Sequence, residues 1–237
     1  MARGAHPEDP ALFGAAALPA LQAATAELSW LLTRGYAERS ATALVGDRHG
    51  LDKRQRDAVR RCAAGTSSLA GRAARACAAA MLHGHALAID GFNCLITTEA
   101  AIAGAPIFRG CDSALRDIAS VHGNWREVAS TTAALAVLAD ALAALRPSEV
   151  VWYLDRPVSR SAELGRELER VAAERALPWR AELVFDPDGV LARGHDVVAS
   201  ADAGVLDRCG AWFDLVSYAL ALAQVPAWIV DLGAASA

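Results

Sequence analysis

Short, nearly uninterrupted apolar runs recur along the C-terminal two thirds of the chain, separated by segments of helical length. The runs cover residues 86–89, 150–154, 181–185, 197–199 and 227–230. The segments expected to be helical are 98–103, about 113–145, 160–175 and 204–222. Continuously apolar strands that alternate with helices are typical of a parallel sheet covered on both faces. The pattern therefore predicts an α/β fold with a parallel sheet of about five strands.

The first third of the chain has a different pattern, in which apolar residues recur at helical spacing. The recurring residues are Leu18, Leu21, Ala24, Leu28 and Leu31. We expect this helix to stop at Gly35. A loop is expected at 45–50 and a second helix at about 52–64. Residues 65–68 should break that helix, and a third helix should follow them and run to about residue 81. Asp52 is a candidate N-cap of the second helix, and Ser67 or Ser68 of the third. We therefore place an α-helical N-terminal domain at 1–83 and an α/β domain at 84–237.

Composition and charge narrow the class of protein. The chain has 237 residues, of which 54% are hydrophobic and 21% charged, and this excludes an intrinsically disordered chain. The formal net charge is −4, yet residues 34–75 contain ten basic and four acidic side chains, so this segment is +6 and the remainder −10. The asymmetry indicates either a polyanionic partner for the basic segment or a solvated, arginine-rich helix face.

The cysteines and the apolar stretches bear on the cellular compartment. The five cysteines are scattered and form no C-x-x-C pair, which argues against a disulfide framework or a zinc knuckle. The first residues contain no apolar segment of a signal peptide, and no clean run of about 20 apolar residues occurs. We therefore expect a cytoplasmic protein that does not bind membranes.

Each of the five apolar runs is followed closely by an aspartate. These residues are Asp90, Asp155, Asp186, Asp202 and Asp231. Because ligands of open parallel sheets bind at the carboxyl ends of the strands, Asp90, Asp155 and Asp202 are expected to converge. Clustered carboxylates repel one another, and Mg²⁺ or Mn²⁺ relieves that repulsion and supports phosphodiester hydrolysis. The alternative for each single aspartate is a turn or a helix cap, as for Asp202 before the helix expected from residue 204.

A densely polar stretch follows the first strand and its helix. It contains Arg109, Asp112, Arg116, Asp117, His122 and Arg126. The arginines and His122 are candidate phosphate ligands, with a salt-bridged turn as the alternative. Neither a Walker pattern nor G-x-G-x-x-G occurs, so no glycine-rich phosphate loop is expected.

Several motifs resemble a family known as domain of unknown function 434, with its companion C-terminal domain 5616. They are W-L-L-T-R-G-Y at 30–36, L-V-G-D-R-H-G-L at 44–51, R-Q-R at 54–56, I-D-G-F-N at 89–93, R-G at 109–110, L-R-D-I-A-S-V-H-G at 115–123, W-Y-L-D-R-P-V-S at 152–159 and V-A-S-A-D at 198–202. The resemblance spans nearly the whole chain. The family's name implies no function.

The C-terminal half also resembles the PIN-like nucleases, especially the NYN branch. D-G-x-N at 90–93, an acid at the end of the next strand and S-x-D at 200–202 occur in the same order. This resemblance implies a PIN-like, Rossmannoid fold and Mg²⁺ or Mn²⁺ bound by Asp90, Asp155 and Asp202. It implies substrate-orienting roles for Asn93 and Ser200. A further acid is expected among Asp186, Asp188 and Asp196, and we choose Asp188. Proteins of this group often form dimers, so a homodimer is one candidate assembly, and the oligomeric state stays open.

Together these observations predict a Mg²⁺- or Mn²⁺-dependent ribonuclease that acts on RNA or on single-stranded DNA. Arg109, Arg116 and His122 would orient the substrate. The phosphate backbone would be gripped by four arginines of the basic segment, Arg48, Arg54, Arg56 and Arg60. Two other functions stay open: a non-catalytic module that binds nucleic acid or protein, and a metal-dependent phosphohydrolase that acts on a small phosphoester.

Overall fold

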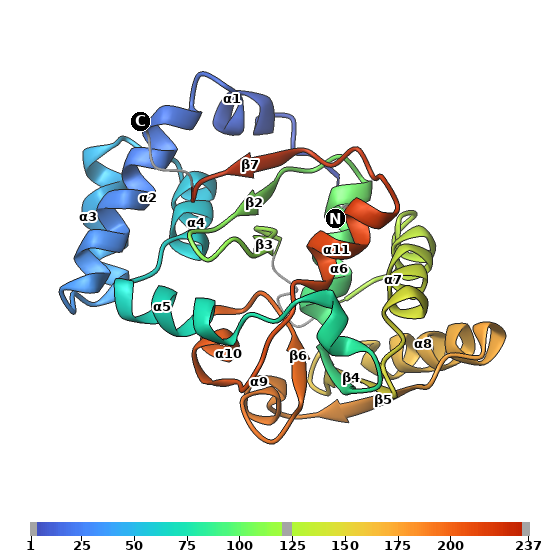
Figure 1. Ribbon diagram of the computed structural model, residues 1–237. Coiled ribbons are helices and arrows are strands. Elements are labelled where there is room, and N and C mark those ends of the chain that lie inside the picture. Colours follow the sequence, from blue (N-terminus) through green and yellow to red (C-terminus); the bar gives the residue numbers. More distant parts are fainter. Residues whose placement is uncertain (1–3, 120–124, 234–237) are drawn as a thin grey trace.

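The computed structural model describes residues 4–119 and 125–233 (Figure 1). N-terminal helices lie beside an α/β body that is built on a four-stranded parallel sheet, and a second, three-stranded sheet lies between them (Figure 1). The predicted α/β class and the predicted helical N-terminal region are both confirmed.

The N-terminal helices differ in detail from the prediction. They are α1 (Asp9–Phe13), α2 (Leu18–Thr33), α3 (Glu38–Arg48), α4 (Lys53–Cys62) and α5 (Thr66–Arg75), followed by a 3-10 turn, η1 (Ala79–Leu82). The loop predicted at 45–50 is wrong, because α3 continues to Arg48. Asp52 is the N-cap of α4 as predicted, and its N–H donates to Gln55 Oε1 at 3.0 Å. The predicted cap of α5 is wrong, because Gly65 takes that position and both serines lie inside the helix.

The main sheet contains four of the five predicted strands. They are β1 (Ala86–Asp90), β4 (Glu149–Asp155), β5 (Trp179–Val184) and β6 (Val197–Ala199), in the order β5-β4-β1-β6. All three pairings are parallel, and Ile89 of β1 lies opposite Trp152 of β4 and Ala199 of β6. All four strands therefore end at the same edge, which is where the predicted acids lie.

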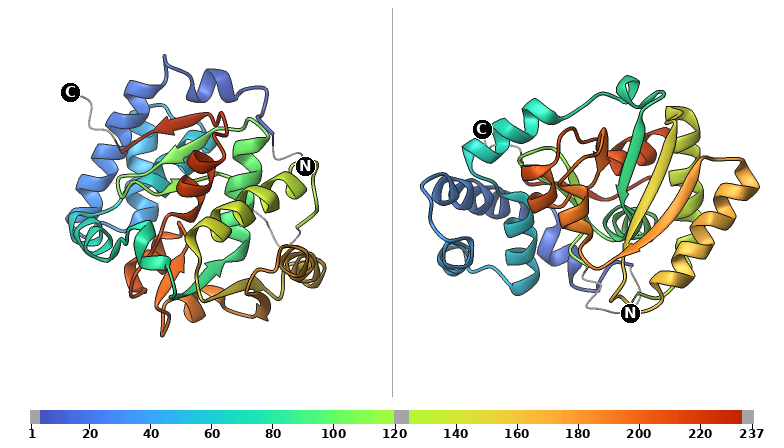
Figure 2. Two further views of the ribbon diagram at one scale, coloured as in Figure 1. Left: turned by 45° about the vertical axis from the view of Figure 1, so that its right-hand side comes forward. Right: turned by 90° about the horizontal axis from the view of Figure 1, so that it is seen from below.

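Helices cover both faces of this sheet (Figure 2). One face packs on α6 (Gly91–Ile102), α7 (Thr131–Leu145), α8 (Ser161–Arg175) and α11 (Leu215–Leu222), and the other on α9 (Pro187–Leu191) and α10 (Ala203–Arg208). Alternate strand residues, such as Ile89 and Ala88, enter the two separate cores, which explains the continuous apolar runs. The single helices predicted at 113–145 and 204–222 are wrong: the first begins only at Thr131, and the second is two helices. In the described ranges, no helix is long and apolar enough to cross a membrane.

The fifth predicted strand belongs to a different sheet. It is β7 (Ile229–Asp231), which pairs in parallel with β2 (Ile107–Arg109), and β2 pairs antiparallel with β3 (Leu115–Arg116). This small sheet shares a core with the N-terminal helices. Phe108 of β2 meets Phe13 of α1 edge-on, with ring centroids 4.8 Å apart, and Val230 of β7 lies in the same core. The expectation of one five-stranded sheet is therefore corrected to sheets of four and three strands.

Candidate functional site

The two motifs at the ends of β1 and β6 bind each other directly. Asp90 ends β1 and caps α6, since its Oδ1 accepts the N–H of Asn93 at 3.4 Å. Its Oδ2 accepts a hydrogen bond from Ser200 Oγ at 2.8 Å. Asn93 Oδ1 accepts the N–H of Ala201 at 2.9 Å. D-G-x-N and S-x-D thus form one hydrogen-bonded unit at the edge of the sheet.

Gly91 is required where it stands. A Cβ at this position would lie 2.5 Å from Leu154 Cδ2 and 3.0 Å from the carbonyl oxygen of Tyr153. The first turn of α6 therefore packs directly against β4, which brings Asn93 to the carboxyl edge of the sheet.

Asp202 acts as a helix cap in addition to its place at the acidic edge. Its Oδ1 accepts the N–H groups of Gly204 and Val205, at 2.8 and 3.0 Å, and so caps α10. Its own N–H donates to Ser200 Oγ at 3.0 Å, so one hydroxyl connects Asp90 with Asp202. The capping role named as the alternative is confirmed.

Burial and neighbouring carboxylates raise the pKa of three carboxyl groups at this edge. Burial, followed by the charges of Asp188 and Asp202, raises the pKa of Asp90 to about 7, against the opposing hydrogen bond from Ser200. The pKa of Asp188 is raised by burial and then by Asp202, Asp155 and Asp186. The pKa of Asp155 is raised by burial and then by Asp186. Asp188, on the first turn of α9, therefore links Asp155 electrostatically with Asp90 and Asp202.

The same acids do not form a complete metal cage by themselves. Within residues 4–119 and 125–233, no three His, Cys, Asp or Glu side chains are placed to hold one metal ion together. The structure thus does not bring Asp90, Asp155 and Asp202 together as one set of three ligands. Asp188 still interacts electrostatically with Asp155 and Asp202, and Mg²⁺ commonly binds to one or two carboxylates together with water and phosphate oxygens.

A cleft of about 1100 Å³ lies between the N-terminal helices and the α/β body. Its walls include the C-terminal end of α2, α4, α5 and the first turns of α6 and α10. Asn93 and Asp202 from the acidic edge line it, and so do Arg60 and Arg61 from α4. The cleft therefore joins the predicted acidic site to part of the predicted basic segment.

Asp117 is a cleft residue that we did not select from the sequence. Its Oδ2 accepts a hydrogen bond from Thr97 Oγ1 at 2.8 Å, and its Oδ1 accepts the N–H of Ala119 at 2.6 Å. Burial raises its pKa, while the nearby charge of Arg61 opposes the shift. The only sequence signal was its place in the polar stretch that begins at Arg109.

Two family profiles match most of the chain. "Protein of unknown function (DUF434)" matches residues 20–75, and "Domain of unknown function (DUF5616)" matches residues 79–218. The chain belongs to the DUF5616 family. Both matches confirm the resemblance that the motifs indicated.

A relative of this DUF5616 protein carries no assigned activity in its name. An uncharacterised protein of Methanocaldococcus jannaschii is 25% identical over 186 residues, which are 78% of this chain and 88% of that protein. No solved structure matches the chain significantly.

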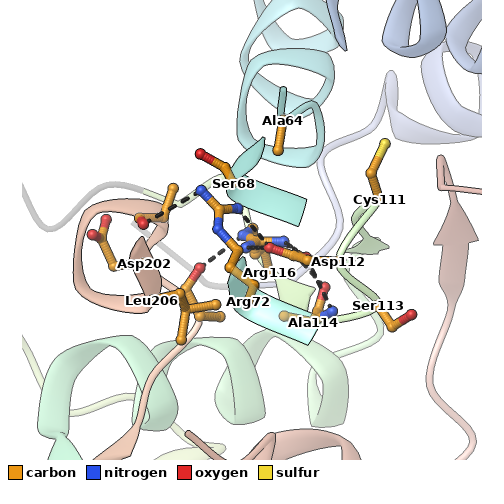
Figure 3. A network of polar contacts seen from close by, with 12 residues as sticks. Ala64, Ser68, Arg72, Cys111, Asp112, Ser113, Ala114, Arg116, Asp202 and Leu206 are labelled. Atoms are coloured by element: carbon orange, nitrogen blue, oxygen red, sulfur yellow. Dashed lines mark hydrogen bonds and ion pairs between the residues drawn. The ribbon is translucent and has the colours of Figure 1, made fainter. Parts of the chain in front are cut away.

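A buried ionic network joins α5 of the DUF5616 protein to the α/β body (Figure 3). Asp112 binds Arg116 through both oxygens, at 2.7 and 2.6 Å, and binds Arg72 Nη1 at 2.7 Å. Arg72 also binds Asp207 of α10 at 2.7 Å. Burial raises the pKa of Asp112, but the hydrogen bonds and charges of the two arginines outweigh it and lower the pKa.

Arg116 holds the backbone that carries the acidic site. Its Nε donates to the carbonyl oxygen of Ala201 at 2.7 Å, next to Asp202. Arg116 lines the cleft but is buried and fully engaged with Asp112, so it positions the loop rather than extending into the cleft. Arg109 lies away from the cleft, 3.7 Å from Asp231. His122 lies outside the described residues.

The four arginines predicted to grip nucleic acid are each neutralised by an acid. Their partners are Glu27 for Arg48 (3.4 Å), Asp9 for Arg54 (2.7 Å), Asp47 for Arg56 (2.8 Å) and Glu38 for Arg60 (3.3 Å). Arg60 is the one of these four that lines the cleft. The charge of the segment therefore overstates how many arginines are available to a ligand.

Proposed function

We propose that this protein is a Mg²⁺- or Mn²⁺-dependent ribonuclease of PIN-like type. The observation that supports the proposal most strongly is the group of acids at the carboxyl edge of the sheet, where burial and neighbouring carboxylates raise the pKa of Asp90, Asp155 and Asp188, beside a cleft lined with arginines. Carboxylates that destabilise one another's charged forms are a favourable environment for a divalent cation.

The donor set fits such a cation. Among the described residues, no side chain donates a hydrogen bond to the carboxylate of Asp155 or Asp188, so their oxygens are available as hard ligands. Asp202 uses Oδ1 to cap α10, which leaves Oδ2. We expect Asp188 to bind the cation together with Asp155 or Asp202. When bound, the cation would supply polarisation of a phosphodiester and a more acidic water.

The remaining residues position the site and the substrate. Asn93 and Arg116 hold the N–H and the carbonyl oxygen of Ala201, which fixes the loop that carries Asp202. Arg61, on the opposite wall of the cleft, is placed to bind the phosphate backbone. The acids would then lie at one end of the bound strand.

A second candidate is a non-catalytic module that binds nucleic acid. It is favoured by the observation that the described residues include no set of three side chains placed to hold one metal ion. In this case the cleft and its arginines would bind RNA without cleaving it.

Titration with Mn²⁺ and Mg²⁺ by calorimetry, with cleavage of labelled RNA on the same samples, tests the proposal. We expect Asp188→Asn to weaken cation binding and to abolish cleavage. Asp140→Asn is the matched control, because Asp140 is an exposed acid on α7 paired with Arg175, and it should leave both unchanged. Cation binding without cleavage of RNA or single-stranded DNA would favour the binding module, and cleavage that survives Asp188→Asn would refute this assignment of the site.

A further inference from the structure

The W-L-L-T-R-G-Y motif ends α2 in a way that exposes its aromatic residues. Tyr36 donates its N–H to the carbonyl oxygen of Leu31 at 3.2 Å, and Gly35 donates to that of Leu32 at 3.0 Å. This is the Schellman arrangement, and it requires the left-handed conformation that Gly35 adopts with φ +80°. The chain reverses at Gly35, and the Tyr36 side chain is left 56% exposed.

Trp30 lies on the last turns of the same helix and is also exposed. Of the six tryptophans in the sequence, Trp30 is the exposed one, with 54% of its surface accessible to solvent, and the other five are buried or half-buried. The guanidinium carbon of Arg34 lies 3.4 Å from the centroid of its ring, so one ring face is stacked with a cation. An exposed indole that stacks on arginine buries little apolar surface in the core. Its exposure therefore favours a role in binding over a role in packing.

Sequence neighbours of these residues line the cleft. Thr33 and Gly35, which alternate in sequence with Arg34 and Tyr36, line the cleft wall, and Thr33 Oγ1 is 3.2 Å from Thr66 Oγ1 of α5. Across the described part of the chain, Arg34 forms no ion pair with a carboxylate, in contrast to Arg48, Arg54, Arg56 and Arg60. The end of α2 therefore combines exposed aromatic rings with an uncompensated positive charge.

We propose that Trp30, Arg34 and Tyr36 form a stacking surface for the bases of a single-stranded RNA whose phosphate backbone enters the cleft. Aromatic rings stack on bases whatever their sequence, and arginine adds cation–π and phosphate contacts. Only unpaired bases offer their faces to side chains in this way, so the strand at this surface is single. The nature of the ligand rests on the proposed function, but the surface is tested by binding alone.

Binding is measured by anisotropy of a labelled oligouridine in EDTA, so that no cation-dependent cleavage occurs. We expect Trp30→Ala to weaken binding by about 5- to 150-fold, the range typical of one lost base stack, and Trp30→Phe to restore most of it. Leu222→Ala is the control, because Leu222 is 48% exposed on α11 and lies outside the cleft lining. An abasic strand of equal length should bind the wild type at least as weakly as oligouridine binds Trp30→Ala.

Tryptophan fluorescence gives a second readout on the same samples. RNA should quench the wild type, and the quenching should disappear in Trp30→Phe. Equal affinity of wild type and Trp30→Ala would overturn the stacking surface, while cleavage that depends on Asp188 would still stand. Binding that depends on Trp30 without cleavage would support the surface and refute the nuclease. Self-association in light scattering that Trp30→Ala abolishes would assign the surface to a second copy of the chain and overturn the proposal.

Discussion

Replacing Asp90 with asparagine should stabilise the protein, and the gain should grow with pH. In the native state burial and the charges of Asp188 and Asp202 raise the pKa of Asp90 to about 7, whereas an unfolded chain has an aspartate pKa of about 4. The native state therefore binds this proton more tightly than the unfolded state does. Wild-type stability then falls as the pH rises from about 4 to about 7.

The size of the change in stability follows from the difference between the native and unfolded pKa of Asp90. One pKa unit corresponds to about 1.4 kcal/mol, so the roughly two units between pH 5 and the native pKa cost the wild type about 3 kcal/mol. Asparagine has no such proton to lose. The hydrogen bond from Ser200 changes in the variant, but that change is the same at each pH and cancels from the comparison.

Urea unfolding in EDTA, followed by circular dichroism at several values from pH 5 to pH 8, measures this difference. We expect the stability of Asp90→Asn minus that of the wild type to increase by about 3 kcal/mol over the range. Asp196→Asn, which removes an exposed carboxylate before β6, should show no such increase. A difference for Asp90→Asn that stays constant with pH would refute the argument that the native carboxyl binds its proton near neutrality.

The remaining predictions concern the helices and the ionic network. Asp112→Asn leaves two buried arginines without their shared partner and should lower the free energy of unfolding by about 3–5 kcal/mol in urea titrations; little change would mean that the network is not stabilising. Gly35→Ala should cost about 1 kcal/mol, because φ is +80° there, and differential scanning calorimetry would show it as a lower Tm. Arg54→Gln removes the cation from buried Asp9 and should cost about 2 kcal/mol without weakening RNA binding. Arg61→Gln should instead weaken RNA binding and reduce the slope of log K against log salt by about 1, which is measured by titration at several salt concentrations.

The acidic edge could be predicted from the sequence because its signal is local. Four strands are apolar runs that alternate with segments of helical length, and in a parallel sheet the residue after each run must lie at the same edge. The small sheet could not be predicted in the same way. β2 and β3 have three and two residues, too few for a pattern, so the apolar run of β7 had no visible partner.

The loop prediction at 45–50 failed because Gly46 lies inside a helix. The loop predicted at 45–50 rested on Gly46 and its polar neighbours, yet Gly46 lies within α3. A Cβ there would lie 2.6 Å from the guanidinium carbon of Arg56, so the residue is small because another side chain packs on it. Sequence alone does not distinguish a glycine that turns the chain from one that admits a neighbour.

The arginines were misjudged for a related reason. Counting charges along residues 34–75 treats each arginine as available to a ligand. The guanidinium of Arg54, however, pairs with Asp9, which lies 45 residues earlier in the chain. Neutralisation is decided by tertiary contacts, and within the described residues Arg34 and Arg61 form no ion pair, although Arg61 donates to the carbonyl oxygens of Asp117 and Ala119.

The pairing of β7 with β2 affects how the chain can fold while it is being made. The core under α2 contains Val230 and Leu232, and Gln22 Nε2 donates to the carbonyl oxygen of Asp231, 209 residues later. At about 5–20 residues per second, the ribosome adds these residues about 10–40 s after the helix that they cover. The apolar face of α2 therefore stays incompletely covered until Val230 and Leu232 have been synthesised.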